Sequence, residues 1–193
     1  MRVTTTTKIT DEKFINLYES KYTHKDCQGR WIFASRKNQN VEAKTKPDAV
    51  VIIGTLGQDT YFQSVQTEHE KIVLIKQFRV PLNGYELGFP AGLIDEGETP
   101  GQAAIREFKE ETGLGVVRVL DVSPPLCNSA GLSDESVVCV FVEAYGEIST
   151  EFNEADEDIE VLALEKGQIQ QEIDKGSHLG AKCWMYLKMS GRI

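Results

Sequence analysis

The chain has 193 residues, of which 40% are hydrophobic and 26% charged, and its formal net charge is −9. These proportions are ordinary for a soluble globular protein, and the length suits one domain with a small appendage. The negative charge argues against a general nucleic-acid-binding surface, which needs a basic patch. The four cysteines and three histidines are scattered along the chain, so we expect neither a zinc site nor a disulfide framework.

No targeting or membrane signal is expected. The first residues, MRVTTTTKITDEKF, lack the apolar run of a signal peptide. No stretch approaches the length of a membrane span. We therefore expect a cytoplasmic protein with no membrane or nucleic-acid partner.

The first part of the chain is polar and strand-like in short pieces. Thr4–Ile9 and Trp31–Phe33 favour extended structure, and Lys25–Gly29 is expected to form a turn between two such pieces. Further along, compact apolar runs take over. The pattern predicts a small N-terminal β segment over residues 1–45 and a main domain over residues 46–193.

The main domain mixes strands and helices, which indicates an α/β fold. Asn83-Gly84 is a turn signal, and Gln58–Glu70 is expected to be a hairpin or surface loop. Core strands are expected at Ala49–Ile53, Ile72–Phe78, Val116–Val122, Val137–Val142 and Ile159–Leu164, and late helices at Glu165–Asp174 and Ala181–Met189.

One stretch, GLIDEGETPGQAAIREFKEETGL at Gly92–Leu114, predicts a loop leading into a short helix. Thr99 suits the N-cap, a proline follows at the first helical position, and Gln102 completes a capping-box spacing. Gly113 suits the left-handed residue that ends a helix. The helix is therefore expected over Pro100–Thr112.

The two faces of this helix differ in character. At about 100° per residue, one apolar face is expected to dock against a core, and it comprises Ala104, Ile105 and Phe108. Three carboxylates gather on the neighbouring face: Glu107, Glu110 and Glu111. Like charges one turn apart destabilise a free helix by roughly 0.2–0.5 kcal/mol per pair, and a hard divalent cation is the natural neutralising partner. The competing interpretation is a solvated acidic helix compensated by Arg106 and Lys109.

The fixed spacing of these residues resembles the Nudix box, the signature of the Nudix hydrolase superfamily. The leading glycine, Glu98, the Arg106-Glu107 pair, the Glu110-Glu111 pair and the closing Gly113-Leu114 all match, and Phe108 stands where an aliphatic residue is commoner. The resemblance implies an α/β/α sandwich with a mixed β-sheet. It also implies Mg²⁺- or Mn²⁺-dependent hydrolysis of a nucleoside diphosphate linked to another moiety.

Flanking motifs resemble the ADP-ribose pyrophosphatase branch of this superfamily, over roughly residues 25–175. They are Gly29-Arg30-Trp31, Ser35-Arg36, Gln77-Phe78-Arg79, Phe89–Asp95 and Ser129–Glu135. The branch implies hydrolysis of the diphosphate bond of ADP-ribose, or of a similar nucleoside diphosphate sugar, to AMP and ribose 5-phosphate. It also implies a homodimer with exchanged N-terminal segments.

The resemblance assigns roles to individual residues. The metal ligands would be the Ala91 carbonyl, Glu107, Glu111 and Glu157, and catalytic roles fall on Arg106, Glu110, Glu111 and Glu157. Arg106 would orient the carboxylates through charge-assisted hydrogen bonds, and Glu98 would support them. The substrate-binding residues would be Arg79 at the diphosphate, Trp31 stacking on adenine, Arg36 nearby, and Glu135. Trp31 is equally well interpreted as a packing residue.

The general base remains open. Ala155–Ile159 resembles a Glu-x-Glu-Asp-Ile pattern of bacterial members, in which the first glutamate is a proposed base. That position is Ala155 here, which leaves Glu154, Asp156 and Glu157 as candidates. Two other functions also remain open. DEDIEVLAL at Asp156–Leu164 resembles GDP-mannose-hydrolysing relatives, and a sensor of the same fold would bind ADP-ribose without cleaving it.

Overall fold

The computed structural model describes residues 1–37, 46–57, 70–153 and 158–193, and it divides into two compact units. Unit 1 comprises Met1–Ala49 and Pro124–Val138, and unit 2 comprises Val50–Ser123 and Cys139–Ile193. The loop expected at Gln58–Glu70 falls outside the described residues except at its last position. The candidate bases Glu154, Asp156 and Glu157 lie outside them as well.

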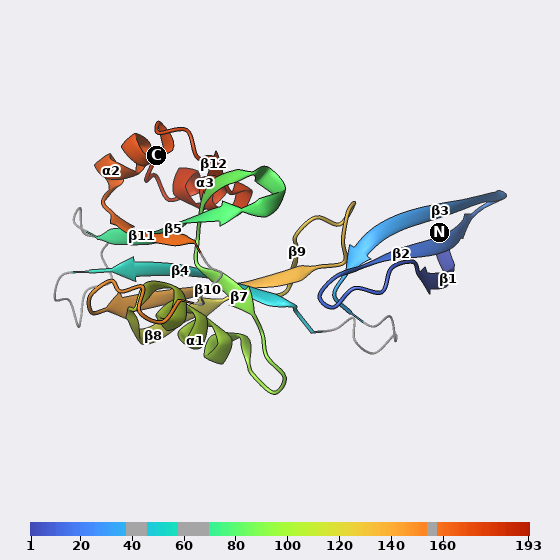
Figure 1. Ribbon diagram of the computed structural model, residues 1–193, viewed down its shortest axis with the longest axis horizontal. Helices are drawn as coiled ribbons and strands as arrows, with labels where there is room; N and C mark the ends of the chain where they lie inside the picture. Colours follow the sequence, from blue (N-terminus) through green and yellow to red (C-terminus); the bar gives the residue numbers. More distant parts are fainter. Residues whose placement is uncertain (38–45, 58–69, 154–157) are drawn as a thin grey trace. The chain divides into compact units, whose positions relative to one another are not determined.

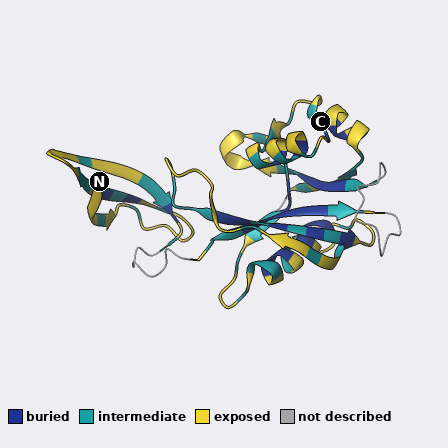
Figure 2. Ribbon diagram, turned by 180° about the vertical axis from the view of Figure 1, so that it is seen from behind, coloured by how far each residue is buried: buried dark blue, intermediate teal, exposed yellow. Residues whose placement is uncertain are grey.

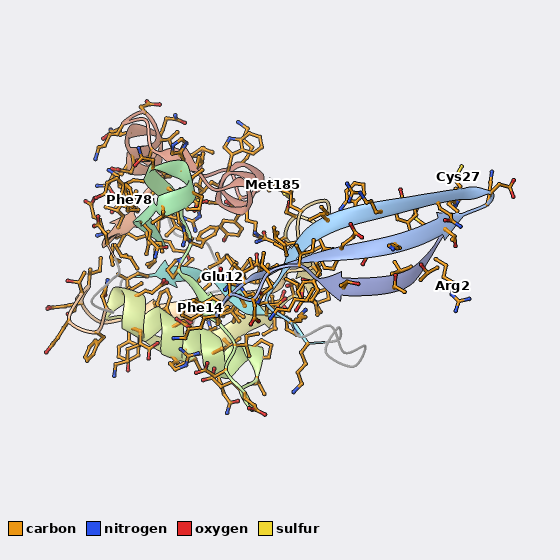
Figure 3. All side chains as sticks on the ribbon, turned by 45° about the vertical axis from the view of Figure 1, so that its right-hand side comes forward. Arg2, Glu12, Phe14, Cys27, Phe78 and Met185 are labelled. Atoms are coloured by element: carbon orange, nitrogen blue, oxygen red, sulfur yellow. The ribbon has the colours of Figure 1, made fainter. Side chains whose placement is uncertain are left out.

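Unit 1 is built on a three-stranded antiparallel sheet of β1 (Arg2–Lys8), β2 (Asn16–His24) and β3 (Cys27–Ser35). The turn between β2 and β3 is shorter than the sequence predicts, because the strands pair as far as His24 and Cys27 and leave two residues between them. Lys25 accommodates this tight turn with a φ of 52°. Figure 3 shows Arg2 and Cys27 towards the same end of the sheet, as the pairing of Arg2 with Thr23 requires.

A loop after β9 (Leu126–Cys127) packs on β3 within unit 1. The Ala34 N–H donates to the Leu132 carbonyl at 2.8 Å, and Trp31 Nε1 donates to the Gly131 carbonyl at 3.2 Å. Trp31 is nevertheless 52% exposed. The indole is therefore held at one edge while much of its surface stays accessible.

Unit 2 is organised by a mixed sheet whose main path runs β12-β6-β5-β4-β10-β8, with β11 paired to β5 and β7 to β4. The pairing of β12 with β6 is parallel, whereas β5 pairs antiparallel with β4, β6 and β11. The strands are β4 (Ala49–Leu56), β5 (Lys71–Arg79), β6 (Gly84–Gly88), β7 (Ala91–Leu93), β8 (Gly115–Val122), β10 (Ser136–Tyr145), β11 (Ile159–Leu164) and β12 (His178–Leu179). A short 3-10 turn, η2 (Val80–Leu82), and left-handed Asn83 connect β5 to β6, as the Asn83-Gly84 signal predicts.

In the described part of unit 2, three helices flank the strands: α1 (Pro100–Thr112), α2 (Lys166–Ile173) and α3 (Ala181–Met189). Figure 1 shows α1 on one side of the strands and α2 and α3 on the other. The expected α/β/α sandwich with a mixed sheet is thereby confirmed. None of the helices in the described part of the chain is long and apolar enough to cross a membrane.

The caps of α1 are those that the sequence predicts. The Gln102 N–H donates to Thr99 Oγ1, the Thr99 N–H donates to Gln102 Oε1 at 2.9 Å, and Gly113 ends the helix with a φ of 74°. Ala104 and Phe108 are fully buried as expected, but Ile105 is 46% exposed. The prediction for Ile105 is wrong because the buried arc of the helix is centred closer to Glu111.

The core of unit 2 is formed by the buried side chains of β4, β5 and β10 and by the covered face of α1. Figure 2 shows the buried residues concentrated in the central strands and on one face of α1. Side chains such as Ile52, Leu74 and Val142 are completely buried. Phe108 reaches β4 opposite Gly54, where an added Cβ would come within 2.5 Å of the Phe108 ring. The missing side chain of Gly54 makes room for the aromatic ring.

We expect Phe108 and Gly54 to compensate for each other's size. Phe108→Leu should leave a cavity and cost about 1–2 kcal/mol of unfolding free energy, and Gly54→Ala alone should cost a similar amount by overpacking. The double variant should lose less than the sum, because each change relieves the other. Chemical denaturation of the four proteins measures this coupling, and strictly additive losses would contradict it.

Candidate active site

The burial of α1 places the carboxylate of Glu111 against the start of β7. Glu111 is 3% exposed, and its Oε2 accepts a hydrogen bond from the Ala91 N–H at 2.9 Å. The preceding Pro90 carbonyl accepts from the Ile52 N–H at 2.8 Å, which fixes this segment to β4. A buried carboxylate is costly unless it is hydrogen-bonded or binds a cation. The helix and β7 thus hold a carboxylate at a defined position inside the protein.

Glu107, one turn earlier on α1, lies directly over Gly92 of β7. A Cβ added at Gly92 would lie 1.9 Å from Glu107 Cδ, and 2.1 and 2.2 Å from its two carboxylate oxygens. Only glycine at this position leaves the Glu107 carboxylate where it is. Two adjacent residues of β7 therefore contact the two carboxylates: Ala91 contacts Glu111, and Gly92 contacts Glu107.

Arg106 links the carboxylates around this site. Its Nε and Nη2 donate to the two oxygens of Glu98 at 2.9 and 2.8 Å, and Nη1 donates to Glu107 at 2.8 Å and Glu110 at 3.1 Å. Nη2 also donates to the Leu93 carbonyl at 3.0 Å. The forked, bidentate arrangement fixes the guanidinium, which in turn orients Glu107. These contacts are compatible with the orienting role that the resemblance implies for Arg106, which stays a prediction.

The ion pairs shift the titration of both partners. Hydrogen bonding to Arg106 lowers the pKa of Glu98 to about 2, and the Asp95 N–H, 3.1 Å from Glu98 Oε2, acts in the same direction. Glu98, followed by Glu107 and Glu110, raises the pKa of Arg106 above its ordinary value. Because the pKa of Glu98 is lower in the folded state, this pair contributes stability above about pH 4.5. The contribution is lost as the pH falls towards 2.

We expect Arg106→Gln to restore an ordinary pKa to Glu98. Without the guanidinium, the Glu98 carboxyl should titrate near 4.5 instead of about 2. Carbon-13 NMR titration of the glutamate carboxyl signals measures the change, with Arg118→Gln as the control because Arg118 pairs with Glu143. A Glu98 signal that still titrates near 2 in Arg106→Gln would contradict the assignment.

The donor set fits a hard divalent cation. Carboxylate and backbone carbonyl oxygens are the ligands that Mg²⁺ prefers, and it usually completes its shell with waters and substrate phosphates. Buried Glu111 and half-buried Glu107, which contact β7 at Ala91 and Gly92, provide such oxygens on one side of the site. No group of three metal-binding side chains is preassembled in the described ranges, whose gap at residues 154–157 includes Glu157. The fit is therefore to an ion that is completed by further oxygen ligands.

Arg79 lies at the end of β5, in the same unit as these carboxylates. Its Nε donates to Glu86 Oε2 at 3.0 Å, and its side chain is 44% exposed. The guanidinium is thus accessible and anchored at one nitrogen. Glu86 was not singled out in the sequence, because a strand carboxylate has no distinguishing motif.

The remaining predicted residues are in unit 1. Arg36 Nε lies 3.5 Å from Glu135 Oε1, and Asn128 Nδ2 donates to Glu135 Oε2 at 2.6 Å. Trp31 and Glu135 both line a pocket of about 580 Å³. Its other lining residues are Met1, Val3, Ser20, Tyr22, Phe33, Lys37, Cys127, Ala130, Ser133 and Asp134. Unit 1 thus brings Trp31, Arg36 and Glu135 together beside a largely apolar pocket.

Comparison with known proteins identifies the family. The NUDIX domain model matches residues 62–184. The chain belongs to the Nudix family. The mouse ADP-sugar pyrophosphatase is 33% identical over 181 residues, covering 89% of this chain and 77% of the mouse protein. The ADP-ribose pyrophosphatase of Bacillus subtilis strain 168 is 36% identical over 99 residues, covering 51% of this chain and 52% of the relative.

A solved structure described as an ADP compounds hydrolase has the same fold. It aligns over all of this Nudix chain and 96% of its own, with a TM-score of 0.68 and 17% identity. The predicted membership of the Nudix superfamily, in its ADP-ribose pyrophosphatase branch, is confirmed, and so is the prediction of a pyrophosphohydrolase. Nudix hydrolases generally use divalent metal ions, which agrees with the oxygen donors around Glu107 and Glu111.

Proposed function

We propose that this Nudix protein hydrolyses the diphosphate bond of ADP-ribose, or of a similar nucleoside diphosphate sugar, to AMP and ribose 5-phosphate. The observation that carries the proposal is the seating of Glu111 and Glu107 on Ala91 and Gly92, with Arg106 bridging the neighbouring carboxylates. An anionic diphosphate needs cations to approach this acidic wall. The names of the mouse and Bacillus subtilis relatives support an ADP-containing substrate.

Bound Mg²⁺, for which Mn²⁺ is a possible substitute, would neutralise the diphosphate and lower the pKa of a coordinated water. Glu107, Glu111, the Ala91 carbonyl and Glu157 would supply ligands. Arg106 Nη1 donates to Glu107 and holds it in place. The same nitrogen also donates to the exposed Glu110. A carboxylate near the site accepts the proton as water attacks phosphorus, and Glu157 is our candidate for it. The phosphorus–oxygen bond to the second phosphate then breaks.

Recognition of the substrate would use basic and aromatic side chains. Arg79 presents forked donors that suit diphosphate oxygens. We propose that Trp31 stacks on adenine with its exposed indole, while Arg36 and Glu135 provide polar contacts nearby. The N-terminal segment, residues 1–45, would exchange between subunits of a homodimer and carry Trp31 and Arg36 to the partner's site. The main domain would be residues 46–193.

The decisive experiment compares phosphate-coupled turnover of ADP-ribose, GDP-mannose and UDP-glucose, each with Mg²⁺, Mn²⁺ or EDTA. We expect metal-dependent release of AMP from ADP-ribose well above turnover of the other two. Faster hydrolysis of GDP-mannose would keep the metal site and overturn the substrate assignment. Tight binding of ADP-ribose without turnover would instead support a sensor.

A further inference from the structure

Glu86 on β6 lies between the guanidinium of Arg79 and the N-terminus of α3. Arg79 pairs with Gly84 across the β5–β6 ladder, so Glu86 is its diagonal neighbour on the same face of the sheet. The contact is the 3.0 Å bond from Arg79 Nε to Glu86 Oε2. Among the described residues, neither terminal nitrogen of Arg79 has a hydrogen-bonding or ion-pair partner. Glu86 thus fixes the plane of the guanidinium and leaves its two terminal nitrogens for another anion.

The other oxygen of Glu86 lies against the N-terminus of α3. Gly180 is the N-cap of this helix, and its N–H donates to the Leu87 carbonyl at 3.0 Å. A Cβ added at Gly180 would lie 2.9 Å from Glu86 Oε1. The first turn of a helix carries unpaired N–H groups and partial positive charge, which favour a carboxylate at this place. Burial and, to a smaller extent, the charge of the nearby Glu86 carboxylate raise the pKa of Cys183 on α3.

We propose that Glu86 is a positioning residue for Arg79: held at the N-terminus of α3, it presents the terminal nitrogens of Arg79 to the substrate diphosphate. This inference rests on the proposed function of Arg79. It also assigns a role to α3, which contributes none of the predicted site residues. Phe78, the neighbour of Arg79 on β5, and Met185 on α3 mark the two elements in Figure 3.

A substitution at Gly180 tests the inference without replacing either charged side chain, Arg79 or Glu86. Its φ of −61° and ψ of 131° are allowed for any residue, so Gly180→Ala adds no backbone strain. The added methyl group acts by displacing the Glu86 carboxylate. Gly88→Ala is the matched control, because it adds a Cβ on the same strand as Glu86 that meets no atom within 4 Å.

The experiment measures four variants: Glu86→Gln, Gly180→Ala, their combination, and Gly88→Ala. We expect the first two to raise the KM for ADP-ribose about two- to fivefold with kcat nearly unchanged, as suits loss of one partly exposed charged contact. The combination should have no larger effect than Glu86→Gln alone, because both changes act on one contact. Gly88→Ala should match the unmodified protein.

Two further readouts separate this inference from the proposed function. The Arg79 Nε–H resonance in nitrogen-15 NMR should shift in Glu86→Gln and Gly180→Ala, but not in Gly88→Ala. The Kd for ADP should rise by the same factor as KM. Because this Kd does not depend on turnover, it tests the positioning role of Glu86 even if the unmodified protein does not hydrolyse ADP-ribose. A shifted resonance with unchanged KM and Kd, or fully multiplicative effects in the combination, would overturn the positioning role.

Discussion

Glu111→Gln should abolish nearly all turnover and leave the fold intact. Gln keeps the size of the side chain and an oxygen that can accept the 2.9 Å bond from the Ala91 N–H. It removes the negative charge that a divalent cation requires from its ligand. Metal-ion catalysis supplies several kcal/mol of transition-state stabilisation, so we expect kcat to fall on the order of 10³-fold.

The stability of Glu111→Gln should change little, by about 1 kcal/mol or less, because neutralising a 3% exposed carboxylate removes a desolvation cost together with its charge. Glu172→Gln is the matched control. Glu172 is 5% exposed and pairs with Lys76 and Lys175 away from β7. It should lose about 1–3 kcal/mol of stability with an unchanged kcat.

Steady-state kinetics and thermal unfolding measure the two variants. If Glu111 has a catalytic role, Glu111→Gln loses turnover but little stability, and Glu172→Gln loses stability but no turnover. Near-normal turnover of Glu111→Gln at saturating Mg²⁺ would remove Glu111 from the metal site. Equal losses of activity and stability in both variants would show that Glu111 has only a structural role.

The helix that carries these residues could be predicted from the sequence almost to the residue. Thr99, Gln102 and Gly113 act through local rules of capping, which depend only on neighbouring residues. The identity of the buried arc could not be predicted as well. Ile105 is exposed and Glu111 buried because the strands that cover α1 decide which face is enclosed. A helical-wheel analysis that searches for apolar residues does not predict that a carboxylate, Glu111, lies on the buried face.

The contacts between elements could not be predicted from the sequence either, because they also depend on how the elements pack together. Arg106 was expected to orient carboxylates, and the contacts that this needs are local, since Glu107 and Glu110 lie within one turn of it and accept its hydrogen bonds. The pairing of Arg79 with Glu86 depends instead on the register of β5 and β6. The dimer and the adenine-binding role of Trp31 rest on resemblance, and they stay predictions.

Gly92→Ala should impair catalysis through Glu107 without a change at any charged residue. The new Cβ would lie 1.9 Å from the Glu107 carboxyl carbon, so the carboxylate must move. Gly92 has no left-handed backbone, and the displaced group is the end of a flexible side chain. The fold should therefore survive. Displacing a group that sets ligand geometry typically costs 10–100-fold, so we expect roughly that loss in activity and a higher Mg²⁺ requirement.

Gly101→Ala is the control, because it lies in the same motif and its added Cβ meets no atom within 4 Å. It should keep full activity and the same Mg²⁺ dependence, since alanine suits a helix better than glycine. In a Glu107→Gln background, Gly92→Ala should add little further loss, because both changes act on one carboxylate. Mg²⁺ titrations of turnover for the four variants measure this. An unchanged Mg²⁺ requirement in Gly92→Ala would mean that the Glu107 carboxylate can serve the metal from elsewhere, and that its contact with β7 is not what positions it.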